Sequence, residues 1–253
     1  MISKEELKKI ALLKGIGSMG NAEKDYLLEI ALLLISRSTK DELVFKGGTC
    51  LSKFYKIDRF SEDIDFTARR EINWDLILQR VISGFSSFGI PAEVKSSEKK
   101  HSSLMVKMRF KGPLYTGLPQ SLSGINIDIN LKSSIDTEPV AAKYSPLYPE
   151  IPGFSLLVMQ EKEILAEKVR AVMSREKARD VYDLWFLLGK GVPFDRKLAQ
   201  KKLDFYNEEW SAEKFAAGIE NKKPIWETEL RELITNVPDF NDVKKAVLEK
   251  VRF

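Results

Sequence analysis

Two aspartates, Asp63 and Asp65, stand two residues apart in the segment SEDIDF, residues 61–66. The alternation there predicts a strand with Ile64 and Phe66 on one face and both carboxylates on the other, about 7 Å apart at the backbone. Two such carboxylates repel each other unless a cation compensates, and Mg²⁺ binds oxygen ligands together with substrate phosphates. The alternative is a solvated polar strand face, which is common.

A third carboxylate, Asp128, lies on the polar face of the clearest strand in the chain, residues 126–131. Three carboxylates on the faces of neighbouring strands are what two-metal phosphoryl chemistry requires. We therefore predict that Asp63, Asp65 and Asp128 are catalytic and metal-binding residues. Asp136 is the rival for the third position, although it falls beyond the strand.

Gly47-Gly48-Thr49 lies where a predicted strand, ELVFK, turns into a short helix. Paired glycines let backbone amides approach a phosphate closely, and a helix N-terminus favours its negative charge. Thr49 adds a hydroxyl donor, and Lys53 in the same short helix is predicted with these residues to bind nucleotide. Gly-Gly turns are common, so the prediction gains its value from the carboxylates that follow.

In the second half of the chain, Lys168 falls on the apolar side of a predicted helix over residues 160–174. Glu161 lies on the same side, so the two are not a solvated charge run. They are either a buried ion pair or groups that face a cleft, and an inward lysine could meet a triphosphate.

The basic residues Arg175, Lys177 and Arg179 flank the start of the next helix, which carries Asp180 and Asp183 on one stripe. Basic residues at a helix start can hold phosphate or an RNA backbone. The residue pattern alone favours a surface cluster with carboxylates stabilised by the helix dipole.

One motif is rejected. Residues 15–20, GIGSMG, match the dinucleotide fingerprint GxGxxG, but a Lys-rich helix precedes them where the fingerprint needs a strand. A turn between two helices is the better interpretation, with a capping box at Ser3 and Glu6 opening the first helix and Asn21 capping the second, over residues 22–37.

The remaining patterns predict a helix over residues 74–88, strands near residues 92–96 and 104–110, and a linker or long loop over residues 138–153. A short strand, FSLLVM, and then only helices follow. The expected fold class is therefore α+β. A mixed sheet with helices occupies residues 1–155, and an all-helical part that completes the active-site cleft occupies residues 156–253.

Composition narrows the chemistry. The chain has 253 residues, one cysteine, Cys50, one histidine, His101, and a net charge of +4. A single histidine excludes metal sites that need several imidazoles, so carboxylates, lysines and hard metals must carry any catalysis. The longest apolar run is far shorter than the roughly 20 residues that cross a bilayer, and the N-terminus is not a signal peptide, so we expect a cytoplasmic protein without membrane contact.

Two segments together resemble the AbiEii/AbiGii toxin family of nucleotidyltransferases. These are FKGGTCLSKFYKIDRFSEDIDF and EKEILAEKVRAVMSREKARDVYDLWFLL, in matching order and spacing over about residues 24–188. The resemblance implies a fold similar to DNA polymerase β in the N-terminal half and a helical C-terminal half. Within this family Thr is usual where the wider superfamily often has Ser, and the third carboxylate is the least regular part of the pattern.

The resemblance also implies roles for individual residues and partners. Gly48 and Thr49 would hold the triphosphate, and Asp63 and Asp65 would bind Mg²⁺. Lys168, Asp180 and Asp183 would be catalytic, and Arg179 would bind the nucleotide. Arg179, Asp180 and Asp183 belong to the Arg-Asp-x-x-Asp segment. Family members are toxins of toxin–antitoxin systems, and some transfer nucleotides to the 3′ end of tRNA, so a nucleoside triphosphate, tRNA or another RNA, and a cognate antitoxin are expected partners. A non-catalytic nucleic-acid-binding or partner-binding module and a metal-dependent nuclease remain alternatives, although a nuclease needs no triphosphate cradle.

Overall fold

A computed structural model describes residues 1–100 and 102–251. The chain divides into two compact units, and each is described by itself. The first comprises residues 1–54, 60–132 and 139–158. The second comprises residues 55–59, 133–138 and 159–253. Two of the segments in the second unit come from before residue 156, the predicted start of the helical part.

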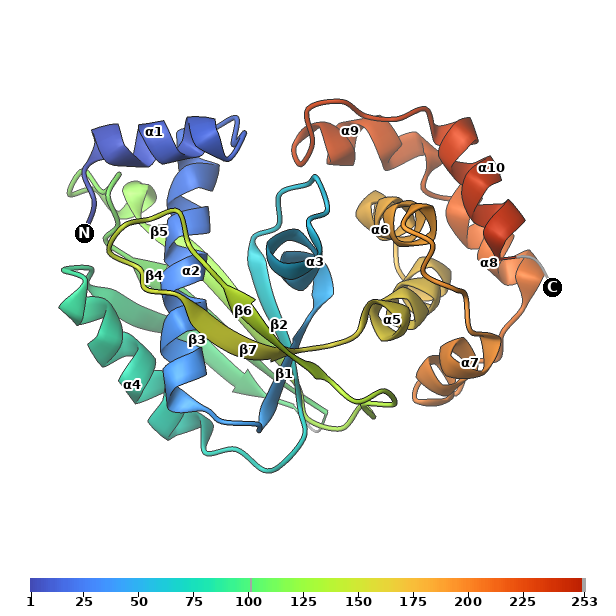
Figure 1. Ribbon diagram of the computed structural model, residues 1–253, viewed down its shortest axis with the longest axis horizontal. Coiled ribbons are helices and arrows are strands. Elements are labelled where there is room, and N and C mark those ends of the chain that lie inside the picture. The colour runs from blue at the N-terminus through green and yellow to red at the C-terminus, as the bar shows by residue number, and fades with distance from the viewer. Residues whose placement is uncertain (101, 252–253) are drawn as a thin grey trace. The chain divides into compact units, whose positions relative to one another are not determined.

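The described part of the first unit forms a seven-stranded mixed sheet with the order β3-β4-β5-β2-β1-β7-β6 (Figure 1). The central strands are β1 (Leu43–Lys46), β2 (Asp63–Ala68) and β5 (Ser123–Asn130). The outer strands are β3 (Ala92–Lys99), β4 (Ser103–Phe110), β6 (Val140–Tyr144) and β7 (Phe154–Val158). β2 pairs antiparallel with β1 and parallel with β5, and β1 pairs parallel with β7. The predicted combination of a mixed sheet with helices is confirmed.

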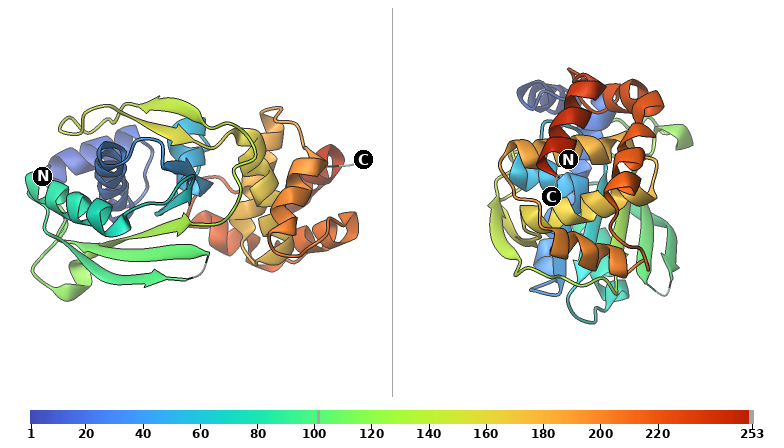
Figure 2. Two further views of the ribbon diagram at one scale, coloured as in Figure 1. Left: turned by 90° about the horizontal axis from the view of Figure 1, so that it is seen from below. Right: turned by 90° about the vertical axis from the view of Figure 1, so that its right-hand side faces the viewer.

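The helices of this unit are α1 (Lys4–Leu13), α2 (Met19–Ser38), α3 (Gly47–Tyr55) and α4 (Trp74–Ser87), with a 3₁₀ turn at Pro119–Ser121. In the left view of Figure 2, the yellow β6–β7 pair and the green β3–β4 pair lie on opposite sides of the blue α2. The sheet therefore curls around α2, and this explains why α2 is apolar and buried on nearly all sides rather than along one stripe.

The ends of the first two helices test the capping predictions. The box at Ser3 and Glu6 is present, because the Ser3 side chain accepts from Glu6 N–H and the Glu6 side chain accepts from Ser3 N–H. Residues 15–20 connect α1 to α2 and confirm the turn between helices. The cap at Asn21 is wrong: α2 begins at Met19, and the Ser18 side chain accepts the Asn21 N–H. Ser18 holds the extended backbone that an N-cap requires.

The prediction of a linker or long loop over residues 138–153 is also wrong in part. Val140–Tyr144 forms β6, which pairs antiparallel with β7 at the edge of the sheet. The strand is short, largely exposed and preceded by Pro139, so it shows no buried alternation by which the sequence could reveal it.

In the second unit the described residues after Val158 form helices joined by short turns. These are α5 (Glu161–Ser174), α6 (Ala178–Gly189), α7 (Arg196–Asp204), α8 (Ala212–Glu220), the 3₁₀ turn Lys223–Ile225, α9 (Trp226–Arg231) and α10 (Phe240–Lys250). Buried Glu163 on α5 ties the segment 133–138 to this unit, because it accepts the backbone N–H of Asp136 at 2.8 Å and of Thr137 at 2.9 Å. Among the described residues, no helix is both long and apolar enough to span a bilayer.

Candidate active site

The predicted faces of β2 are confirmed. Ile64 and Phe66 are fully buried in the core of the first unit, whereas Asp63 and Asp65 alternate with them and are partly exposed. Successive side chains of a strand point to opposite faces, so the apolar residues fix where the carboxylates go. The polar side of β2 and β5, with Asp63, Asp65 and Asp128, is called the carboxylate face below.

The strand register decides which of these carboxylates are neighbours. Asp65 pairs with Asp128, and Asp63 pairs with Asn126, across the parallel β2–β5 ladder. Asp65 and Asp128 therefore lie side by side on the same face. The carboxylate of Asp63 instead accepts a hydrogen bond of 2.8 Å from the Asn126 amide. The sequence pattern does not indicate this role for Asn126, because an amide on a polar strand face is ordinary.

Lys46, a lysine that the sequence analysis missed, lies beside these carboxylates in the sheet. Lys46 at the end of β1 is the register partner of Asp65. Burial raises the pKa of Asp128, the positive charge of Lys46 opposes that rise, and the negative charge of Asp63 adds to it. The carboxylate face is thus a place where negative charge is costly and where a further cation is favoured. The available signal was the position of Lys46, one residue before the paired glycines.

Gly47 brings the start of α3 directly against the carboxylate face. Its φ is +76°, in the left-handed region, and a Cβ at this position would lie 2.2 Å from Oδ2 of Asp65. Only glycine fits here. Because α3 begins at Gly47, its first backbone amides and the positive end of its dipole lie beside the Asp65 carboxylate. The structure therefore brings the paired glycines and the carboxylates together, as their predicted roles require.

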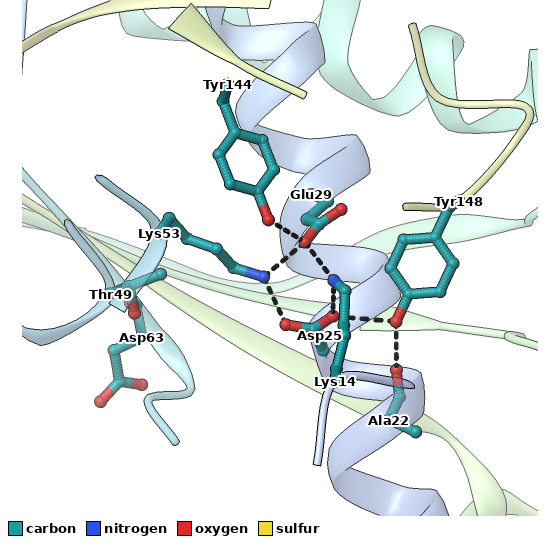
Figure 3. Close-up of polar contacts among 9 residues, drawn as sticks. All are labelled: Lys14, Ala22, Asp25, Glu29, Thr49, Lys53, Asp63, Tyr144 and Tyr148. Carbon is teal, nitrogen blue, oxygen red and sulfur yellow. Dashed lines mark hydrogen bonds and ion pairs between the residues drawn. The ribbon is translucent and has the colours of Figure 1, made fainter. Parts of the chain in front are cut away.

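Thr49 and Lys53 of α3 have protein partners. Thr49 is fully buried and its hydroxyl donates to the backbone carbonyl of Asp63, so it joins the start of α3 to the start of β2. The ammonium of Lys53 binds Asp25 and Glu29 of α2, with 7% of its side chain exposed. Figure 3 shows the Asp63 carboxylate pointing away from that ammonium. Direct nucleotide contacts of Thr49 and Lys53 stay predictions.

In the second unit, Lys168, Asp180 and Asp183 come together in one buried group. Lys168 Nζ lies 2.8 Å from Asp180 Oδ1 and 2.6 Å from Asp183 Oδ2. Arg59 binds Asp183 through two hydrogen bonds of 2.5 and 2.8 Å, and Arg175 Nε lies 2.7 Å from Asp180 Oδ2. These five residues are called the ion-pair cluster. Sequence reasoning missed Arg59, which lies more than a hundred residues from its partner.

The ion-pair cluster changes the acidity of its members. Burial alone would raise the pKa of Asp183, but Arg59 and Lys168 hold it below its ordinary value. Asp180 also has a lowered pKa, because the charge of Lys168 and the contacts of Arg175 outweigh its burial. Both carboxylates are therefore ionised, and the predicted surface cluster is wrong for these two aspartates, because neither has any exposed surface.

The other predictions for the second half of the chain have mixed outcomes. Lys168 points inward as predicted, with 6% of the residue exposed. An ion pair between Lys168 and Glu161 is wrong, because Glu161 pairs with Lys190. Arg179 is partly exposed and lies 3.9 Å from Glu229, so nucleotide binding by Arg179 stays a prediction. Asp136, the rival third carboxylate, pairs with Lys202 at 2.8 Å within the second unit.

The oxygen donors of the carboxylate face suit Mg²⁺. No group of three or more His, Cys, Asp or Glu side chains within residues 1–100 and 102–251 lies ready to hold a metal ion. Mg²⁺ is usually bound by one or two carboxylates, substrate phosphates and water rather than by an all-protein cage. The neighbouring pair Asp65 and Asp128, with the start of α3 beside it, fits that mode of binding.

Comparison with known proteins adds the family. Residues 32–249 match the family described as nucleotidyl transferase AbiEii toxin, type IV toxin–antitoxin system. No curated protein matches the chain. Among solved structures, the chain is similar to MenT4, a nucleotidyltransferase toxin from Mycobacterium tuberculosis H37Rv, with a TM-score of 0.65 and 20% identity over 99% of this chain and 88% of that one.

Two further structures share the fold. JHP933 from Helicobacter pylori has a TM-score of 0.62 and 20% identity, with 92% of this chain and 90% of that chain covered. A putative nucleotidyltransferase from H. pylori has a TM-score of 0.59 and 20% identity, with 91% and 96% covered. The family match covers most of the chain and agrees with the resemblance inferred from the two sequence segments. The chain belongs to the AbiEii family of nucleotidyltransferase toxins of type IV toxin–antitoxin systems and is a nucleotidyltransferase that uses a nucleotide substrate.

Proposed function

We propose that this toxin transfers a nucleoside monophosphate from a nucleoside triphosphate to tRNA, with Mg²⁺ held by Asp65 and Asp128 together with Asp63. The observation that carries the proposal is the contact between Gly47 and Asp65, because it sets a phosphate-binding helix start against a pair of neighbouring carboxylates. A nuclease or a non-catalytic binding module does not require that arrangement.

The start of α3 is the proposed phosphate grip. The first backbone amides of a helix have no partner within the helix, so these amides and the helix dipole favour the negative charge of the β- and γ-phosphates. Lys46, next to Asp65 in the sheet, adds positive charge on the same face. When bound, Mg²⁺ supplies charge neutralisation for the phosphates and for the leaving pyrophosphate.

The acceptor hydroxyl is proposed to attack the α-phosphate in line from the side of Asp128, which takes the hydroxyl proton while the bond between the α- and β-phosphates breaks and pyrophosphate leaves. Most of the rate acceleration then comes from positioning and charge stabilisation, because phosphoryl transfer asks little covalent chemistry of the protein. The family resemblance supports tRNA as the acceptor, and the net charge of +4 is in keeping with a polyanionic substrate. Membership in a type IV system also supports a cognate antitoxin.

The test is to incubate the protein with Mg²⁺, total tRNA and each α-labelled nucleoside triphosphate in turn. We expect label to enter tRNA with one nucleotide and to disappear when EDTA replaces Mg²⁺. Asp65→Asn should be inactive, whereas Asp41→Asn, at a surface pair with Arg70, should behave like the wild type. Label that enters only protein would overturn the tRNA acceptor, and transfer in EDTA would overturn the metal.

A further inference from the structure

Helix α2 buries three carboxylates, and two of them share their cationic partners. Asp25 and Glu29 lie one helical turn apart, and 6% of Asp25 and none of Glu29 is exposed. Lys14, Lys53, Tyr144 and Tyr148 surround them (Figure 3). These six residues, all in the first unit, are called the α2 network.

The α2 network balances its charges through close contacts. Glu29 Oε1 lies 2.5 Å from Lys14 Nζ and 2.6 Å from Lys53 Nζ, and it accepts the Tyr144 hydroxyl at 2.5 Å. Asp25 contacts both ammonium groups and accepts the Tyr148 hydroxyl at 2.8 Å. Two cations therefore face two anions, and Glu29 joins three separate elements, α2, α3 and β6.

Such a network is poorly explained by stability alone. Buried ion pairs lose hydration, and well-packed apolar side chains are often as stable in their place. The α2 network is better explained as a device that fixes geometry, because each ammonium must stay where both carboxylates reach it. Burial alone would lower the pKa of Lys53, but Asp25 and Glu29 raise it, so Lys53 is charged at neutral pH.

The element held by Lys53 is the one that begins at the phosphate grip. Lys53 lies one turn after Thr49, whose hydroxyl binds the Asp63 carbonyl, and α3 starts at Gly47 against Asp65. α3 is thus fixed at two points, to β2 through Thr49 and to α2 through Lys53. A rotation of this short helix about the first point would move the backbone amides of Gly47 and Gly48.

We propose that Lys53 and Glu29 are a positioning pair that sets the start of α3 for nucleotide binding and transfer. The inference rests on the proposed role of Gly47–Thr49 as the phosphate grip. In this view Lys53 acts through the helix and does not touch the nucleotide. Lys14 and Asp25 form the second pair of the α2 network, which joins α2 to the chain before it. Asp25 also contacts Lys53, but without Asp25 the ammonium of Lys53 keeps its contact with Glu29.

Two charge-balanced double variants test the positioning pair. Lys53→Met with Glu29→Gln leaves Lys14 and Asp25 to neutralise each other, and Lys14→Met with Asp25→Asn leaves Lys53 and Glu29 paired. Thermal unfolding should therefore change by similar amounts in both. We expect the first variant alone to lose about 10²-fold in kcat, the scale of a 1 Å misplacement, and to bind nucleoside triphosphate at least about 10-fold more weakly.

The kinetic and binding results of these variants distinguish a positioning role of Lys53 and Glu29 from a purely structural one. Wild-type kcat and nucleotide affinity in the first variant would overturn the positioning pair, and so would an equal loss in both folded variants. If the first variant does not fold, Glu29→Gln alone replaces it, with an expected loss of about 10-fold. If the wild type fails to label tRNA, the proposed acceptor fails, and equilibrium binding of nucleoside triphosphates still decides between the two variants.

Discussion

The carboxylate face of the first unit and the ion-pair cluster of the second use the same residue type in opposite ways. On the carboxylate face, Asp65 and Asp128 are neighbours in register, Asp63 is close by, and the pKa of Asp128 is raised because burial outweighs the nearby positive charge of Lys46. In the ion-pair cluster, three cations surround Asp180 and Asp183 and lower the pKa of both.

This difference gives the two regions different expected roles: the carboxylate face in activity and the ion-pair cluster in stability. In a cluster that supplies its own counter-charges, the loss of one partner leaves a buried charge uncompensated, so a substitution there is expected to lower stability. Catalytic roles of Lys168, Asp180 and Asp183 stay predictions. A face where burial raises the pKa of a carboxylate, as it does for Asp128, gains from binding a cation, and such shifted groups are common at functional sites. The two regions therefore predict opposite consequences for the same Asp→Asn substitution.

The largest expected effect is on activity at the carboxylate face. Asp65→Asn should reduce transfer by at least about 10³-fold, or about 4 kcal/mol in the barrier, because it removes charge stabilisation of the reacting phosphates. Circular dichroism and thermal unfolding should remain close to those of the wild type. Transfer within 10-fold of the wild type would show that Asp65 is not an active-site carboxylate.

The next effect is on stability in the ion-pair cluster. Asp183→Asn should lower the free energy of unfolding by about 3 kcal/mol, because it leaves the buried charges of Arg59 and Lys168 without their common partner. Urea unfolding measures this. The control is Glu227→Gln at the exposed pair with Arg231, where we expect a change below about 0.5 kcal/mol. Equal changes in both variants would contradict a structural role for Asp183.

A substitution at Gly47 tests the close approach of α3 to the carboxylate face. Gly47→Ala should cost about 2 kcal/mol of stability and most of the activity, since a Cβ meets Asp65 Oδ2 and the residue has a positive φ. Gly20→Ala is the matched control, because its Cβ meets nothing within 4 Å and α2 already includes this residue. An active, stable Gly47→Ala protein would mean that α3 can shift without consequence.

The smallest expected effect is a gain of stability rather than a loss, at Asp128. The raised pKa of Asp128 means that its ionised form costs stability above the ordinary value of 3.8, so Asp128→Asn removes a cost at neutral pH. We expect Tm to rise by about 1–2 °C while activity falls. Differential scanning calorimetry at pH 7 without divalent cations checks this. A fall in Tm like that of Asp183→Asn would remove the contrast between the two regions.

The sequence alone determined the local features. The period-2 alternation placed Ile64 and Phe66 on the buried face and therefore placed Asp63 and Asp65 on the other, because strand geometry leaves no third choice. The capping box at Ser3 and the inward direction of Lys168 also follow from neighbours within one or two helical turns. The edge strand β6 gave no such pattern, since it is short and largely exposed.

Only the tertiary structure decided which distant residues meet. The partners of Lys168 are Asp180 and Asp183 rather than Glu161, and Lys53 pairs with Asp25 and Glu29. Two acidic residues one turn apart in a largely apolar helix were a signal for the α2 network, but their cations come from other elements. A charged side chain shows its need for a partner in the local sequence, whereas the partner itself is chosen by how the elements pack, because Coulomb attraction depends on distance in space and not along the chain.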